Sequence, residues 1–279
     1  MKNKKILLSL IIIFSIFFIG FYTGHKINQP EIYDYKEYGG RFFNIEGTNK
    51  KSIKVDERTG IFITYGQSNS ANYGLVSLNN YPNVYQFFLG DVYEYKNPSL
   101  GTTGLRDSVW GLVGNKLVDQ NIFSQVVFAN TGWGGRSINE LKTGHYLDYF
   151  IYTYNQLFNH FNKVDGILYH QGESDNNPDK VKLYYANFLE FVKTLNDNGI
   201  KVPIYLSQAS YCTSAWPVNK SLTDIQRKLI TDHDYIFEGP NTDLLTDTKY
   251  RFDQCHFSEE GNNKFADMWV ESLKTNFKK

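Results

Sequence analysis

The chain has 279 residues, of which 41% are apolar, so it is long enough for one large domain or two small ones. Its 29 basic and 29 acidic residues give a formal net charge of zero, with no long run of either sign. Because proteins that bind nucleic acid normally carry a basic stripe, we expect no nucleic-acid partner. Two cysteines, Cys212 and Cys255, exclude a disulfide-rich scaffold and a Cys/His zinc site. The sequence favours neither a single disulfide between the two cysteines nor two free thiols. A disulfide would hold the loop that contains His256 in place.

The N-terminus carries a targeting signal. Three lysines among the first five residues precede an apolar stretch over residues 6–22. This stretch is short for a membrane span, long for a signal-peptide core, and not followed by a small-x-small cleavage site. We therefore predict an uncleaved signal-anchor in residues 1–26 that leaves the rest of the chain outside the cytoplasm. The alternative is a cleaved signal peptide and a secreted or periplasmic protein. Residues 27–56 read as a stalk and lead-in, and residues 57–279 as the functional domain.

Beyond residue 57, short apolar runs alternate with longer amphipathic ones, which is typical of βαβ units around a parallel sheet. We predict strands over residues 60–65, 125–129, 166–169, 202–206 and 235–237. We predict helices over residues 104–118, 147–162, 179–197, 222–231 and 259–275. Residues 75–103 fit this scheme poorly. They form either an insertion that shapes a substrate cleft or an ordinary surface loop.

A polar segment, Gly66-Gln67-Ser68-Asn69, directly follows the first predicted strand. Ligands of α/β proteins bind beyond the carboxyl ends of parallel strands, where Ser68 would lie. A helical turn that begins there would direct free N–H groups at the group that the serine attacks. Ser68 is therefore a candidate nucleophile. Taken alone, the segment fits a helix N-cap equally well, which is the commoner role of serine at such a junction.

Polar residues also follow the second and third predicted strands. The glycine pair that ends at Gly135 allows close backbone approach, as an oxyanion hole requires, although tight turns use glycines more often. After the third strand, the Gln171 amide could donate to an oxyanion. Glu173 reads as a residue that orients groups near Ser68. Strand alternation turns His170 away from Gln171, so we interpret it as a buried histidine rather than a base.

A fourth polar segment, Asp253-Gln254-Cys255-His256, precedes the last predicted helix. Asp253 and His256 are three residues apart and can touch within one loop. The carboxylate would then hold the imidazole in one tautomer, and His256 could take a proton from Ser68. By itself this spacing fits a capping aspartate and a surface histidine better.

Four segments together resemble the SGNH hydrolase superfamily. They are GQSN at 66–69, GGRSI at 134–138, HQGESD at 170–175 and DQCHFS at 253–258. Their order is similar to that in the carbohydrate-esterase branch, which includes sialate O-acetylesterases and acetylxylan esterases. The resemblance covers about residues 60–275 and implies a flavodoxin-like α/β/α sandwich, here with a mostly parallel five-stranded sheet. One departure is Ser70, where relatives often carry Met or Ala.

The resemblance also implies roles for individual residues. Ser68 would be the nucleophile, His256 the base and Asp253 its partner. The backbone N–H groups of Ser68 and Gly135, with the Gln171 amide, would form the oxyanion hole. Asn69 and Glu173 would support this site.

The predicted activity is that of a serine esterase that removes O-acetyl groups from carbohydrate through an acyl-serine, without a metal or another cofactor. Two alternatives use the same site: a glycan O-acetyltransferase, and a non-catalytic glycan-binding relative. A lipase-type role is less favoured, because no exposed apolar lid run is evident. The sugar, the acetyl position and the oligomeric state stay open.

Overall fold

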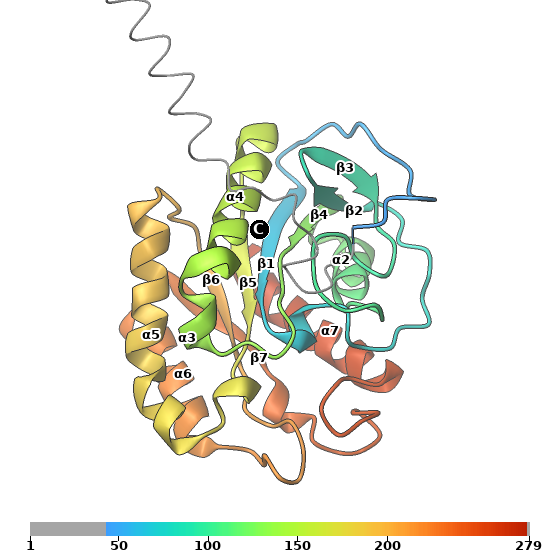
Figure 1. Cartoon of the computed structure of the whole chain (residues 1–279). Coiled ribbons are helices and arrows are strands. Elements are labelled where there is room, and N and C mark those ends of the chain that lie inside the picture. Colours follow the sequence, from blue (N-terminus) through green and yellow to red (C-terminus); the bar gives the residue numbers. More distant parts are fainter. Residues whose placement is uncertain (1–42, 278–279) are drawn as a thin grey trace, which may run out of the picture. The chain divides into compact units, whose positions relative to one another are not determined.

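A seven-stranded sheet organises the computed structural model, which describes residues 43–277 (Figure 1). Its strand order is β3-β2-β4-β1-β5-β6-β7. The strands are β1 (Thr59–Gly66), β2 (Val84–Phe88), β3 (Asp91–Glu94), β4 (Gln125–Asn130), β5 (Gly166–His170), β6 (Ile204–Gln208) and β7 (Ile236–Asn241). Every neighbouring pair is parallel except β2 and β3. The predicted α/β fold with a mostly parallel sheet is confirmed.

The predicted number of five strands is wrong, because β2 and β3 come from the region that fitted the pattern poorly. Val84 pairs with Val126 of β4, and Phe87 and Phe88 are buried, so β2 extends the sheet beyond β4. Leu89 and Gly90 then form the tight turn to β3, and both have positive φ angles. The turn signals in this region therefore mark a hairpin, which occupies the edge of the sheet.

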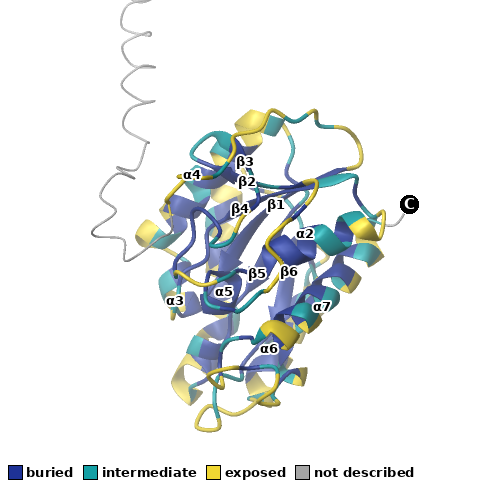
Figure 2. Ribbon diagram, turned by 90° about the vertical axis from the view of Figure 1, so that its right-hand side faces the viewer, coloured by how far each residue is buried: buried dark blue, intermediate teal, exposed yellow. Residues whose placement is uncertain are grey.

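Helices cover both faces of the sheet. They are α2 (Trp110–Asp119), α3 (Ile138–Leu141), α4 (Gly144–Phe161), α5 (Pro178–Asp197), α6 (Lys220–Asp232) and α7 (Glu259–Phe277), with short 3-10 turns η1 (Ser68–Ser70), η2 (Glu173–Asp175) and η3 (Thr242–Leu244). Alternating β1 residues serve the two faces: Ile61 and Ile63 pack in the core under α4 and α5, whereas Phe62 packs in the core under α2 and α7. Because β1 is buried on both faces, its sequence is a continuous apolar run. Figure 2 shows that the strands of the sheet are coloured as buried.

Helix α2 begins at Trp110, six residues later than predicted. Gly104 has a φ of +91°, and the segment around it runs along the chain that follows Ser68. The Arg106 N–H donates to Asn72 O at 3.0 Å, and Asp107 forms an isolated bridge with Gly74. In these contacts, the backbone groups that helical hydrogen bonds would need are paired with residues 72–74. The contacts also place this loop beside the candidate nucleophile.

The predicted membrane segment in residues 6–22 lies outside the described residues. Within residues 43–277, no helix has the length and apolar character that crossing a membrane requires. Part of the predicted lead-in is described, and it packs against the sheet. The Lys51 N–H donates to Val92 O at 2.9 Å, and the Glu94 N–H donates to Asn49 O at 2.9 Å.

Candidate active site

Ser68 is the first residue of η1, and only Gln67 separates it from the carboxyl end of β1. The turn is held against β5, because the Gln67 N–H donates to His170 O at 3.0 Å. Gly66 makes this approach possible: a Cβ atom there would lie 1.9 Å from His170 O. Within residues 43–277, neither the Ser68 N–H nor the Gly135 N–H has a hydrogen-bond acceptor. Both groups are therefore available to an incoming oxyanion.

The Gly134–Gly135 turn is fixed by contacts on both sides. The Gly134 N–H donates to the Thr103 hydroxyl at 2.7 Å, and a side chain at Gly134 would collide with the Tyr73 hydroxyl. On the other side, the Ile138 N–H donates to Asp175 Oδ2 at 2.8 Å. The turn after β4 is thereby tied to the turn after β5. Gly135 itself has a φ of +68° and open space beside it.

Asp253 and His256 form the predicted pair. His256 Nδ1 lies 2.7 Å from Asp253 Oδ2, and Asp253 Oδ1 accepts the N–H groups of His256 at 2.7 Å and of Cys255 at 3.0 Å. Burial works to raise the pKa of Asp253, but the hydrogen bonds from His256 and Cys255 outweigh it and hold the pKa below its ordinary value. The carboxylate therefore stays ionised and fixes the imidazole orientation. The Tyr73 ring stacks on the imidazole, with ring centroids 5.2 Å apart.

The His256 loop lies against the Ser68 turn. The Asn69 amide donates to Cys255 O at 3.4 Å, and the Leu75 N–H donates to Phe257 O at 3.1 Å. The first bond joins the immediate neighbours of Ser68 and His256, and the second joins Leu75, seven residues after Ser68, to the other neighbour of His256. Within residues 43–277, no direct hydrogen bond links the Ser68 hydroxyl to His256. Catalytic hydrogen bonds are often longer without substrate and tighten only in the reacting complex.

Glu173 occupies the centre of a buried polar cluster beneath this contact. Its Oε1 accepts from the Asn69 amide at 2.8 Å and lies 3.1 Å from His170 Nε2. Burial works to raise the pKa of Glu173, but the charge of His170 and the two hydrogen bonds lower the pKa to about 2. Glu173 therefore orients Asn69, which contacts the His256 loop. The supporting role of both residues in catalysis stays a prediction.

The Gln171 amide is already engaged. Its nitrogen points to Asp175 Oδ2, to Arg136 O at 3.2 Å and to Gln67 Oε1 at 3.3 Å. A primary amide carries two N–H groups, so these three acceptors use both. The structure thus places Gln171 between the turns after β1, β4 and β5. Its role as an oxyanion donor stays a prediction, and it requires that one of these bonds be exchanged for substrate.

Comparison with known proteins assigns the chain to a family. A family model described as "Carbohydrate esterase, sialic acid-specific acetylesterase" matches residues 58–275. The chain belongs to this family of carbohydrate esterases. It is thus a carboxylic ester hydrolase with an SGNH-type fold. A search of curated proteins found no significant match.

Solved structures share the fold of this esterase. A protein from Arabidopsis thaliana has 16% identity and a TM-score of 0.63, over 79% of this chain and 99% of that one. NanS has 12% identity and a TM-score of 0.56, over 81% of this chain and 99% of that one. A carbohydrate acetylesterase from Xanthomonas citri has 14% identity and a TM-score of 0.51, over 78% of this chain and 57% of that one. At such identities, the likeness establishes the fold alone.

The candidate site also contains residues that the sequence did not single out. Tyr73 covers the imidazole, and Arg251 lies buried behind the His256 loop. Arg251 Nε donates to Leu245 O at 2.7 Å and Nη2 to Thr242 O at 3.0 Å, while Nη1 donates to Cys255 O. Burial lowers the pKa of Arg251. No local pattern marks either residue, because each contact depends on how separate segments pack.

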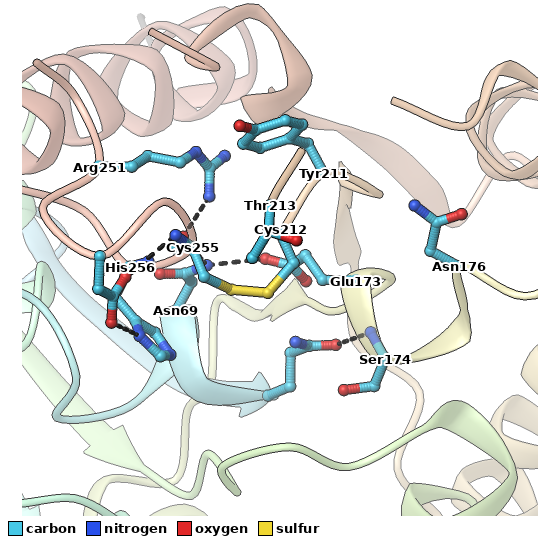
Figure 3. The surroundings of a disulfide bond; sticks show 12 residues. Asn69, Glu173, Ser174, Asn176, Tyr211, Cys212, Thr213, Arg251, Cys255 and His256 are labelled. Carbon is cyan, nitrogen blue, oxygen red and sulfur yellow. Dashed lines mark hydrogen bonds and ion pairs between the residues drawn. A yellow bond between two sulfur atoms is a disulfide. The ribbon is translucent and has the colours of Figure 1, made fainter. Parts of the chain in front are cut away.

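A disulfide between Cys212 and Cys255 resolves the alternative that the sequence left open (Figure 3). It joins the loop after β6 to the residue that precedes His256. Within residues 43–277, no three His, Cys, Asp or Glu side chains group as metal ligands. The chemistry available at this site is that of a hydroxyl, an imidazole, a carboxylate and free backbone N–H groups.

Proposed function

We propose that this enzyme is a serine esterase that removes O-acetyl groups from carbohydrate, with Ser68 as its nucleophile. The observation that carries the proposal is the Asp253–His256 pair, 2.7 Å apart, in a loop bonded to the Ser68 turn through Asn69. The free N–H groups of Ser68 and Gly135 support it, because they suit the charge that develops on an attacked carbonyl. The family match supports acetylated carbohydrate as the substrate class.

The proposed reaction has two steps. His256 takes the Ser68 proton as the hydroxyl oxygen attacks the acetyl carbonyl, and the sugar oxygen leaves with that proton. Water, activated by the same imidazole, then attacks the acetyl-serine and releases acetate. Asp253 holds the imidazole tautomer and stabilises the imidazolium in both steps. The backbone N–H groups stabilise the oxyanion, and loss of one such donor typically costs about 10²–10³ in rate.

The test compares aryl acetate hydrolysis by the full-length protein and by Ser68→Ala. We expect the variant to lose at least about 10³ in kcat, because the nucleophile is removed. Ser70→Ala is the matched control, since Ser70 is also buried in η1 but its hydroxyl donates to Tyr65 O at 3.2 Å. It should stay within about tenfold of the wild type, since surrounding groups keep their places. Equal rates for the wild type and Ser68→Ala would end the proposal.

The substrate and the acceptor need separate measurements. Acetate release from a panel of O-acetylated glycans, including sialic acids and xylan, identifies the sugar. A hydrolase releases acetate with water as the sole acceptor, whereas an O-acetyltransferase requires a second glycan. A non-catalytic glycan-binding relative would bind sugar without a burst from an aryl ester. We favour a catalytic protein because the Asp253–His256 pair is intact, and hydrolysis over transfer because the matching family model describes an esterase.

We also propose that residues 1–26 anchor the esterase in a membrane, with residues 57–279 as the catalytic domain outside the cytoplasm. The basis is the lysine-led apolar stretch over residues 6–22. Membrane fractionation of the full chain and of a form lacking residues 1–26 tests this. Recovery of the full, uncleaved chain in the soluble fraction would contradict the anchor.

A further inference from the structure

Cys255 is the point at which the catalytic loop is held in place (Figure 3). Its N–H donates to Asp253 Oδ1 at 3.0 Å, so its backbone helps to fix the carboxylate. Its carbonyl oxygen accepts from Asn69 of the nucleophile turn and from the buried Arg251. Its sulfur is bonded to Cys212. A displacement of Cys255 would therefore move both members of the Asp253–His256 pair relative to Ser68.

Contacts within the His256 loop fix its shape more than its position. The Phe252 N–H donates to His256 O at 3.1 Å, and the Gln254 N–H donates to Arg251 O at 3.3 Å. Both bonds stay within residues 251–256, and Phe252, Asp253 and Gln254 are exposed. The bond from Asn69, which comes from outside the loop, is long at 3.4 Å. Arg251 and the Leu75–Phe257 hydrogen bond also tie the loop and its flank to the rest of the fold. The disulfide adds a covalent restraint next to His256.

The other end of the disulfide is firmly anchored. Asp243 Oδ1 accepts the N–H groups of Ser210 at 2.8 Å and of Tyr211 at 2.9 Å, immediately before Cys212. The Asn219 N–H donates to the Ser210 hydroxyl at 2.7 Å, which closes the loop onto the start of α6. Asn176, after η2, donates its amide to Ser210 O at 3.0 Å. Through Cys212, the disulfide therefore holds the His256 loop at a fixed place relative to this well-anchored segment.

From these contacts we propose that Cys212 is a positioning residue for catalysis, and that reduction of its disulfide switches the esterase off reversibly. The inference rests on the proposed function of Ser68 and His256. Cys212 is partly exposed whereas Cys255 is buried, so a thiolate attacks the Cys212 sulfur and displaces the Cys255 thiolate. With a dithiol as reductant, two electrons pass to the protein, which gains two thiols. The dithiol closes to its own cyclic disulfide.

The released loop keeps its internal hydrogen bonds and the contacts of Arg251, but it loses its covalent tie to the loop after β6. A misplacement of about 1 Å in a reacting group can cost 10²-fold in rate. We therefore expect kcat to fall by about 10- to 100-fold, with less change in KM for a small ester, because the base rather than the ester pocket moves. Since disulfides persist in oxidising compartments, this requirement agrees with the predicted location outside the cytoplasm.

The experiment measures aryl acetate hydrolysis by the full-length protein, oxidised, reduced with a dithiol, and reoxidised. We expect kcat to fall on reduction and to recover on reoxidation. Cys212→Ser should be as slow as the reduced wild type. The double variant Cys212→Ala/Cys255→Ala is the control for the reagent, because it should be slow and indifferent to dithiol. Circular dichroism shows whether each form is folded, and the assay temperature is kept well below the unfolding midpoint. A fall in kcat then reflects displacement of the His256 loop and not unfolding of the protein.

A second readout does not depend on turnover. The His256 imidazole stacks on the ring of Tyr73, which lies outside the loop, with centroids 5.2 Å apart, so the nuclear magnetic resonance signal of its ring protons should shift on reduction. If the bridge only stabilises the fold, its reduction would lower the unfolding midpoint but leave this signal and kcat unchanged, which would overturn the inference. If the oxidised protein hydrolyses the ester through Ser68 and dithiol has no effect, the inference fails and the proposed function stands. If the oxidised protein shows no ester hydrolysis at all, the proposed function fails, and the signal decides the positioning role alone.

Discussion

Replacement of Glu173 by glutamine tests the electrostatics of the buried cluster under the site. The carboxylate is fully buried beside His170 and Asn69, and its pKa is about 2 against an ordinary value of 4.5. A group whose pKa is lower in the folded chain stabilises the fold above its unfolded pKa. That stabilisation disappears as the pH falls from 4.5 towards 2. The difference between the two values corresponds to about 3 kcal/mol of unfolding free energy at neutral pH.

The assay is urea unfolding of the wild type and Glu173→Gln at several values between about pH 7 and about pH 2.5. At neutral pH the variant should be about 3 kcal/mol less stable, and the two should converge at acid pH. Glu271→Gln is the matched control, because Glu271 is exposed and paired with Lys274 at 2.9 Å. It should stay within about 0.5 kcal/mol of the wild type throughout. If the difference in unfolding free energy between the wild type and Glu173→Gln does not change with pH, the reasoning is refuted.

Two further predictions concern the Asp253–His256 pair and the close approach of β1 to β5. Asp253→Asn should keep the fold but lower kcat for an aryl acetate by about 10³–10⁴, because the imidazole loses its fixed tautomer; a loss below tenfold would argue against His256 as the base. Gly66→Ala should cost more than about 3 kcal/mol of unfolding free energy, since its Cβ would lie 1.9 Å from His170 O. Gly90→Ala, with a φ of +87° and nothing within 4 Å, should cost only about 1 kcal/mol. Similar unfolding midpoints for the two glycine variants would show that the backbone at Gly66 does not lie as close to His170 O as described.

The local pattern of apolar residues was enough to predict most strands of the sheet, but it did not predict β2 and β3. The runs that became β1, β4 and β5 are buried on both faces, so continuous apolar residues marked them. Strand β2 is also apolar, but it lies among turn signals, and the hairpin to β3 depends on pairing with β4. Such pairing is a contact between distant segments, which no local period records.

The candidate site divides in the same way. Asp253 and His256 are three residues apart, so their contact could be expected from the chain alone. The Asn69–Cys255 bond spans 186 residues, and the engagement of Gln171 requires three turns to meet. Likewise, no spacing rule reveals that Tyr73 stacks on the imidazole.

By itself, the order of apolar runs and polar segments determined the layered α/β architecture and the approximate positions of five of the seven strands, because strand and helix periods are local properties. The tertiary structure alone decided the pairing of Cys212 with Cys255, the burial of Arg251 and the use of both Gln171 N–H groups. These features depend on distances between segments that lie far apart along the chain. Such distances are set only when the two cores pack on the faces of the sheet.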